Sequence, residues 1–159
     1  WKAREYGIHT RFIELAGEIN ESMPDYVVSR VAEVLNSRRK AVGASRILIM
    51  GLAYKADVDD MRESPTFHLL DRFKAMGATV DYYDPHIPVI TPTREHAAWT
   101  GTRSVVWSEE VVSGYDLVLI ATNHKTYRLD ELAAWAPVIV DTRNAMSVVK
   151  TAPGQVFKA

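Results

Sequence analysis

The segment from residue 46 to residue 65 constrains the fold more than any other part of the chain. It begins with an apolar run, 46–50, which is typical of a buried strand, and Gly51 ends that run. It finishes with Ser64 and Pro65, which suit a helix start because serine can accept a hydrogen bond from a free backbone N–H and proline needs none. A charged loop lies between the two. Parallel sheets are built from such strand–loop–helix units, and they bind ligands at the carboxyl ends of their strands.

The same alternation continues along the chain and predicts an α/β fold. Strands are predicted at 46–50, 78–83, 104–107, 116–121 and 137–141. Helices are predicted between them at 64–76, 108–112 and 129–135. Such alternation indicates a parallel sheet covered on both faces, and right-handed crossovers make it a doubly wound, Rossmann-like domain. We expect the strand order 3-2-1-4-5, and we expect the tail after Ser147 either to add an edge strand or to fray.

A long helical pattern precedes the first strand. Apolar side chains recur at steps of three or four residues from Phe12 to Val34, and Pro24 either kinks one helix or begins a second. A helix of this length ahead of the alternation often joins domains or pairs with a partner chain. The alternative is an ordinary first helix packed on the sheet. Gly7 is predicted to end a shorter helix before it.

Composition and charge exclude several classes of function. The chain has 159 residues, 47% of them hydrophobic, with 19 basic and 20 acidic side chains, which is the balance of one globular domain with room for an appendage. The near-zero net charge gives no reason to expect binding to nucleic acid or to an anionic membrane surface. No apolar run approaches the roughly 20 residues that span a bilayer, so a cytoplasmic location is the default expectation.

The residue types also limit the chemistry. The chain contains no cysteine, which excludes disulfides, thiolate metal sites and a cysteine nucleophile within it. Its five histidines show no ligand spacing, so we expect no metal site. The chain begins with Trp1 rather than methionine, in the middle of a pattern, and we therefore expect a fragment of a longer protein.

The loop after the first strand does not suit a dinucleotide. The run that follows Gly51 has no second or third glycine, and Tyr54 and Lys55 would obstruct the close approach of a pyrophosphate to the backbone. Lys55 instead offers a positive charge to an anionic ligand, and Tyr54 offers an aromatic surface. The alternative is a solvated loop that only connects two elements.

A second cation is predicted at the same sheet edge. Arg143 follows the strand at 137–141, and the carboxyl ends of parallel strands meet at one edge, so Arg143 and Lys55 lie on the same side. Two cations there indicate a phosphate or diphosphate ligand. The alternative is a surface arginine paired with Asp141.

Several acidic residues are better interpreted as scaffold. Asp59 and Asp60 invite comparison with phosphoacceptor receiver domains, but they lie several residues into the loop and no acceptor aspartate follows a middle strand. We expect both to bond backbone N–H groups and to pair with Arg62. Asp84 occupies the position of a ribose-binding acid in a Rossmann fold, although a simple Asp-Pro turn is the preferred interpretation. His124 faces the expected cleft without a visible partner.

Taken together, these residues resemble the UDP-sugar 6-dehydrogenases, a family that includes UDP-glucose, UDP-N-acetylglucosamine and UDP-N-acetylmannosamine dehydrogenases. The run 51–65 resembles the carboxy-terminal signature of the family almost throughout. Two further motifs match at 83–85 and 140–144, in the expected order. The opening residues 1–3 and the helix around 18–20 resemble the central helical segment. The residues of these motifs are most similar to those of the UDP-N-acetylhexosamine branch of the family.

The resemblance implies a division of the chain and a reaction. Residues 1–43 would be the end of the central helical region, with a homodimer formed through the helix around 11–36. Residues 44–159 would be the UDP-sugar-binding, Rossmann-like domain. The family oxidises the sugar C6 alcohol to a carboxylate in two hydride transfers to NAD, through a thiohemiacetal and a thioester on a cysteine. That cysteine and most of the NAD site would lie upstream, so this chain would hold no catalytic residue and would be inactive alone.

The resemblance also implies roles for individual residues. Tyr54 and Lys55 match positions that contact the UDP-sugar, and Arg143 matches an arginine that also reaches the substrate. Arg62 matches an arginine that approaches NAD, across a subunit boundary. Two other interpretations stay open at this point: a stand-alone regulatory module that senses a nucleotide, and a purely structural dimerisation piece. Which UDP-sugar is oxidised does not follow from these residues.

Overall fold

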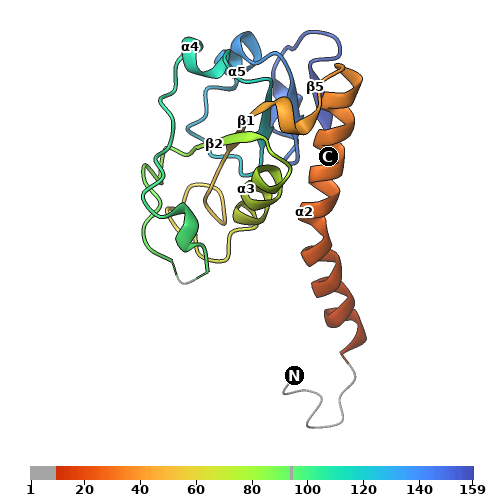
Figure 1. The fold of residues 1–159 in the computed structure, drawn as a ribbon, viewed down its shortest axis with the longest axis vertical. Coiled ribbons are helices and arrows are strands. Elements are labelled where there is room, and N and C mark those ends of the chain that lie inside the picture. Colours follow the sequence, from red (N-terminus) through yellow and green to blue (C-terminus); the bar gives the residue numbers. More distant parts are fainter. Residues whose placement is uncertain (1–9, 94) are drawn as a thin grey trace.

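A five-stranded parallel sheet forms the centre of the molecule (Figure 1). The structure is a computed structural model that describes residues 10–93 and 95–159, so the predicted helix ending at Gly7 and the motif at 1–3 lie outside the described residues. The strands are β1 (Arg46–Met50), β2 (Thr79–Tyr83), β3 (Leu117–Ile120), β4 (Ile139–Asp141) and β5 (Val156–Lys158). Their order is β2-β1-β3-β4-β5, and every neighbouring pair is parallel. The predicted Rossmann-like α/β class is confirmed.

The strand predicted at 104–107 is wrong. Of the two outcomes expected for the tail, the edge strand is confirmed. The segment 104–107 does lie beside β2, because the N–H of Val105 donates to the carbonyl of Tyr82 at 2.9 Å. It forms no strand, however, and the nearest ladder contact is an isolated antiparallel bridge between Arg103 and Val89. The fifth strand is instead the tail strand β5, which pairs with β4 at the opposite edge. The neighbour relations predicted for the other four strands are correct.

Helices cover both faces of the sheet, as expected for a doubly wound domain. One face carries α2 (Arg11–Ser37) and α3 (Thr66–Ala75), and the other carries α4 (Glu109–Val112) and α5 (Leu129–Trp135). Alternate side chains of β1 serve the two faces: Ile47 and Ile49 belong to the first core, and Leu48 and Met50 to the second. Three short 3₁₀ helices, at Val42–Ala44, Ala97–Trp99 and Ala145–Val148, complete the description.

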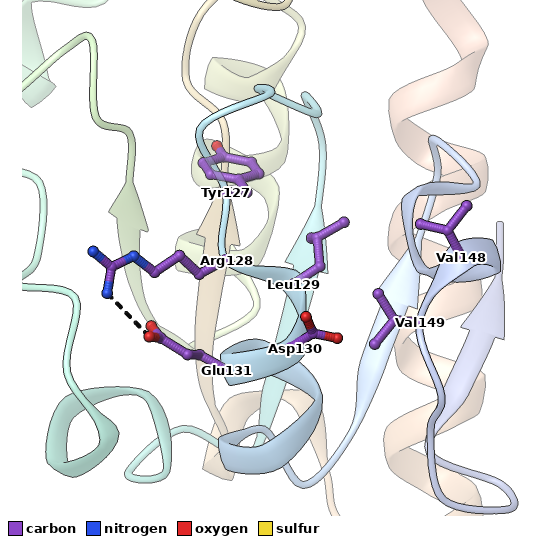
Figure 2. Close-up of a pocket in the computed structure, with 7 residues that line it drawn as sticks. All are labelled: Tyr127, Arg128, Leu129, Asp130, Glu131, Val148 and Val149. Carbon is purple, nitrogen blue, oxygen red and sulfur yellow. Dashed lines mark hydrogen bonds and ion pairs between the residues drawn. The ribbon is translucent and has the colours of Figure 1, made fainter.

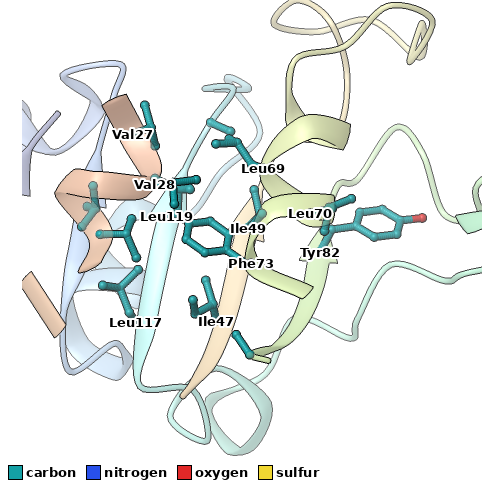
Figure 3. Packing of buried hydrophobic residues seen from close by; sticks show 14 of the residues in the cluster. Val27, Val28, Ile47, Ile49, Leu69, Leu70, Phe73, Tyr82, Leu117 and Leu119 are labelled. Atoms are coloured by element: carbon teal, nitrogen blue, oxygen red, sulfur yellow. The ribbon is translucent and has the colours of Figure 1, made fainter. Parts of the chain in front are cut away.

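The first core shows how the pattern of the sequence produces this packing (Figure 3). Phe73 of α3 lies between side chains of β1 and β3, with Ile49 and Leu119 among its neighbours in the cluster. Val28 of α2 closes the cluster from the other side. Because β1, β3 and β4 are buried on both faces, they read as continuous apolar runs rather than as alternating ones.

Helix α2 is continuous through Pro24, and its two halves have different environments. In the second half, Val31 and Leu35 are buried against the sheet domain. In the first half, Phe12 and Ile19 are 89% and 50% exposed, and Figure 1 shows this half extending beyond the domain. The predicted contact with the sheet therefore holds only for the second half. No helix in the described part of the chain combines the length and the apolar character needed to cross a membrane.

Candidate functional site

The turn after β1 is closed tightly against β3. Gly51 has φ +95°, and a Cβ at this position would lie 2.5 Å from the Cβ of Thr122. The hydroxyl of Thr122 donates to the carbonyl of Ala53 at 2.8 Å, and the hydroxyl of Thr66 donates to the carbonyl of Gly51 at 3.0 Å. Only glycine combines this backbone conformation with so close an approach of the neighbouring strand end.

Asp84 anchors this turn from the end of β2. One carboxylate oxygen accepts the N–H groups of Leu52 and Ala53 at 2.8 and 2.9 Å, and the other accepts those of His86 and Ile87 at 2.8 and 3.2 Å. The residue is 1% exposed. Burial acts to raise the pKa of Asp84, but hydrogen bonds from His124 and from backbone N–H groups hold that pKa below its ordinary value. The preferred interpretation of a turn is confirmed, since both carboxylate oxygens are occupied within the protein.

His124 links Asp84 to the charged loop. Its side chain is fully buried, with Nε2 3.1 Å from Asp84 and Nδ1 accepting the N–H of Asp57 at 2.8 Å. Because a backbone N–H can only donate, Nδ1 carries no proton, and the hydrogen-bond network assigns the proton to Nε2, which donates to Asp84. The residue expected to lack a partner therefore has two. No local pattern could have indicated them, because they lie 67 and 40 positions away.

Within the loop, Asp60 has the scaffold role that was predicted for it. The role predicted for Asp59 belongs instead to Asp57. The side chain of Asp60 accepts from the backbone N–H, Nε and Nη2 of Arg62, each at 3.0 Å, which lowers the pKa of Asp60 to about 2. Asp59 is exposed and makes no hydrogen bond with the described residues. Asp57 instead accepts the N–H of Lys125 at 2.8 Å, which lowers the pKa of Asp57.

The two residues predicted at the ligand-facing end of the loop are available to solvent. Tyr54 is 49% exposed, and its N–H donates to the carbonyl of Asp60 at 2.8 Å, which closes the loop. The Nζ of Lys55 lies 5.5 Å from the centre of the Tyr54 ring. Lys55 forms no ion pair with the described residues. An exposed ammonium beside an exposed aromatic ring is an arrangement that can meet an anionic, ring-containing ligand.

Arg143 lies at the same sheet edge, after β4, but does not contact Lys55. Its backbone N–H donates to Asp141 at 2.9 Å, and its Nε donates to the carbonyl of Ala121 at 2.6 Å. Arg143 thus bonds to Asp141, as the alternative expected, but through its backbone N–H and not through its guanidinium. Its Nη atoms make no hydrogen bond with the described residues. Arg143 and Lys158 line a depression of about 500 Å³.

A second depression, of about 520 Å³, lies beside α5 (Figure 2). Its lining residues come from the segments after β3 and β4: Tyr127, Arg128, Leu129, Asp130, Glu131, Val148 and Val149. Arg128 pairs with Glu131 at 3.0 Å across this region. The hydroxyl of Tyr127 is buried without a partner among the described residues, and burial raises its pKa. Neither depression is lined by Tyr54 or Lys55, and sequence reasoning missed the second one.

Three residues bring potential metal ligands together, but their hydrogen bonds argue against an ion. Asp57, His86 and His124 each place one ligand atom within 4.8 Å of the others. Both ring nitrogens of His124 are already hydrogen-bonded, and Asp57 is held by Lys125. These groups are better described as a hydrogen-bonded network than as a metal site.

A long segment that includes the turn and the charged loop matches a known family. Residues 48–148 match the model described as the UDP binding domain of the UDP-glucose/GDP-mannose dehydrogenase family. The chain belongs to this family. The resemblance stated from the residues alone is thereby confirmed, including its assignment to the UDP binding domain.

Relatives within the dehydrogenase family cover most of the chain. It is 30% identical over 154 residues to a UDP-N-acetyl-D-mannosamine dehydrogenase of Methanococcus maripaludis, a match that covers 92% of this chain and 33% of the relative. It is 31% identical over 144 residues to an NDP-N-acetyl-D-galactosaminuronic acid dehydrogenase of Ralstonia nicotianae, covering 89% and 32%. The chain thus spans about a third of the length of these curated relatives.

A solved structure of a family member supports the architecture. An NDP-N-acetyl-D-galactosaminuronic acid dehydrogenase from Methanosarcina mazei superimposes with a TM-score of 0.73 at 25% identity, covering 91% of this chain and 30% of the other. The long helix and the parallel sheet therefore belong to the arrangement found in larger dehydrogenases.

Proposed function

We propose that this chain is the substrate-binding domain of an NAD-dependent UDP-sugar 6-dehydrogenase. The proposed substrate is a UDP-N-acetylhexosamine, oxidised at C6 from the alcohol to the carboxylate. The observation that carries the proposal is the presence of two cationic side chains at one sheet edge. Lys55 lies exposed beside Tyr54, and Arg143 leaves its Nη groups without a hydrogen bond to the described residues. The names of the relatives support the reaction class and the acetylated sugar.

The proposed roles follow from charge and exposure. Lys55 meets the diphosphate as a point charge, and the free Nη groups of Arg143 can make paired hydrogen bonds to phosphate oxygens. Tyr54 supplies an aromatic surface against the nucleotide or the sugar. None of these residues performs the hydride transfer, so we propose that they bind and orient the substrate.

The residues of this chain do not fit a complete NAD site. The N–H groups of Leu52 and Ala53 are the ones that would meet a pyrophosphate at the turn after β1, and both are taken by Asp84. Arg62, whose side chain is 83% exposed, would contribute one positive charge toward NAD held elsewhere in the protein. NAD, when bound, accepts the hydride. The catalytic cysteine is likewise proposed to lie outside this chain, which contains none.

Helix α2 supports a proposal for the assembly. We propose that residues 1–43 end a central helical region and that a homodimer forms through the helix around 11–36, where apolar side chains lie exposed. A stand-alone nucleotide-sensing module is the alternative. It requires a reading frame that begins near Trp1 with no Rossmann half upstream, which sequencing of the gene decides.

Titration calorimetry with UDP and with NAD tests the proposed function. UDP should bind to the 159-residue chain and NAD should not, and Lys55→Met or Arg143→Met should each weaken UDP binding about tenfold, the cost of about 1.4 kcal/mol for one lost charged contact. Lys74→Met, at the far end of α3, is the matched control and should bind UDP as the unmodified chain does. Binding of NAD in preference to UDP would contradict the assignment.

A further inference from the structure

The loop that presents Tyr54 and Lys55 is fixed by one buried imidazole. His124 Nδ1 accepts the N–H of Asp57 at 2.8 Å, and Asp57 in turn accepts the N–H of Lys125 at 2.8 Å. The two segments therefore hold each other through reciprocal bonds, because Asp57 donates to the His124 ring and accepts from the backbone of Lys125. Asp57 has φ +62°, a left-handed conformation that is costly for a residue with a side chain and that persists only where surrounding contacts enforce it.

The far side of the imidazole is anchored in the core. Nε2 donates to Asp84, which also holds the N–H groups of Leu52 and Ala53 at the start of the same loop. The chain from Leu52 to Asp57 is thus attached at both ends to one Asp84–His124 pair. Tyr54 and Lys55 lie between these two attachments, so the position of the pair sets where they are presented.

We propose that His124 is a positioning residue that holds the loop from Tyr54 to Asp60 in its ligand-binding conformation, and that protonation of His124 releases this loop. The inference rests on the proposed function in so far as the ligand is a UDP-sugar. The neutral Nε2–H tautomer is required, because only an unprotonated Nδ1 can accept the N–H of Asp57.

Protonation reverses the role of Nδ1 from acceptor to donor. Two N–H groups would then face each other at Asp57. A carboxylate oxygen of Asp57, which now holds Lys125, lies within 4.8 Å of a His124 ring nitrogen and is one acceptor in reach. The N–H of Asp57 then loses its acceptor, and a turn of the carboxylate toward Nδ1 competes with its bond to Lys125. Histidine side chains ordinarily change charge between about pH 5 and 8, and this is the range in which the release is tested.

The charged and titratable groups around the ring come from three segments. Asp84 and His86, after β2, face it on one side, and the His86 ring centre is 4.7 Å away. Asp57 approaches from the loop after β1. Tyr127, with its ring centre at 5.2 Å, and Lys125 belong to the segment after β3 that carries His124 itself.

The imidazole nitrogen signals test the geometry without any ligand. In ¹⁵N NMR of the 159-residue chain at about pH 7.5, at the upper end of the range in which histidine titrates, His124 should show the Nε2–H tautomer. Hydrogen exchange of the Asp57 amide should be slowed there and should become at least about tenfold faster, relative to the intrinsic rate, at about pH 5.5. An Nδ1–H tautomer, or protection of that amide that does not change with pH, would overturn the proposal.

Two substitutions separate the two hydrogen bonds of His124. His124→Asn keeps an acceptor near the position of Nδ1, and His124→Gln keeps a donor near the position of Nε2, and neither side chain titrates.

The ligand is UDP-glucose, because both of its phosphates are esterified, whereas the terminal phosphate of UDP would itself titrate near about pH 6. His68→Asn, at an exposed position of α3, is the control.

The expected results differ between the variants. For the unmodified chain and the His68 control, the Kd for UDP-glucose should rise about tenfold from about pH 7.5 to about pH 5.5, the range in which histidine titrates. His124→Asn should bind within about threefold of the unmodified chain at the higher pH and lose the pH dependence, and His124→Gln should bind about tenfold more weakly at both values. An unchanged pH dependence in His124→Asn, or equal binding by the two variants, would overturn the positioning role. If UDP-glucose fails to bind at the higher pH, the tautomer and the amide exchange decide the positioning role alone, and the titration with UDP decides the proposed function.

Discussion

At the scale of single residues, the carboxylate of Asp84 is the group on which the site depends most. It is buried and accepts four backbone N–H groups and one imidazole N–H. Charged acceptors of several donors stabilise a fold because each donor would otherwise be buried without a partner. The carboxylate therefore fixes the backbone from which Tyr54 and Lys55 project.

Replacing this carboxylate by an amide should be costly. Asp84→Asn turns an NH₂ group toward backbone donors, and we expect the free energy of unfolding to fall by about 3 kcal/mol. Urea denaturation measures the change. Asp59→Asn, at an exposed position in the same loop, is the control and should change stability by less than about 0.5 kcal/mol. Equal effects at the two positions would contradict the anchoring role of Asp84.

The lowered pKa of Asp84 predicts the sign of a pH dependence. A carboxyl group whose folded-state pKa is depressed stabilises the fold fully above its unfolded pKa of about 4, and that stability is lost as the pH falls through the folded-state pKa. The difference in unfolding free energy between the unmodified chain and Asp84→Asn should therefore shrink as the pH is lowered below about 4. A difference that stays constant down to the acid limit of folding would show that the carboxylate is not responsible.

Sequence reasoning at this scale found the charges but not all of their partners. The pairing of Asp60 with Arg62 was predicted because the two are only two residues apart. The contacts of His124 with Asp57 and Asp84 were not, because the ring meets groups from two other loops that the fold alone brings together. Asp57 holds a backbone N–H in place of the predicted Asp59, because the fold alone brings Lys125 beside Asp57.

At the scale of elements, the contact between the ends of β1 and β3 sets the shape of the turn. Gly51 allows it, since a Cβ there would lie 2.6 Å from the backbone nitrogen of Thr122. Gly51→Ala should lower the free energy of unfolding by about 3 to 5 kcal/mol, from the positive φ and the clash together. Thermal or urea unfolding measures this change.

Gly101 provides the matched control for that substitution. It also has a positive φ, +85°, but no atom of the described residues lies within 4 Å of the place that a Cβ would occupy. Gly101→Ala should therefore cost only the conformational strain of about 1 to 2 kcal/mol. Similar losses for the two alanine variants would mean that the close approach to Thr122 contributes nothing.

Elements that are buried on both faces were the predictable ones. The strands β1, β3 and β4 read as apolar runs, because helices cover both sides of the sheet there. The segment 104–107 is also largely apolar. The N–H of Asp84, however, donates to the hydroxyl of Ser104 rather than to a backbone carbonyl of this segment, and no ladder forms. Strand β5 has only three residues, too few for a period to be recognised.

At the scale of the whole molecule, the first half of α2 presents an apolar stripe to solvent. Phe12, Leu15, Ile19 and Met23 recur at helical spacing and are all exposed. Light scattering after size-exclusion chromatography should give twice the mass of the chain, and Ile19→Lys should shift the population toward the monomer. Glu21→Lys changes the opposite side of the helix and should leave the mass unchanged. A monomer before any substitution would contradict the proposed dimer.

We propose that the carboxyl edge of the sheet binds the UDP part of a nucleotide sugar. Mapping of backbone amide shifts during titration of the ¹⁵N-labelled chain with UDP tests it most directly. We predict perturbations that saturate together and that group on the loops after β1 and β4, around Tyr54, Lys55 and Arg143. Perturbations confined to α2 or to the opposite edge of the sheet, or none at saturating UDP, would contradict it.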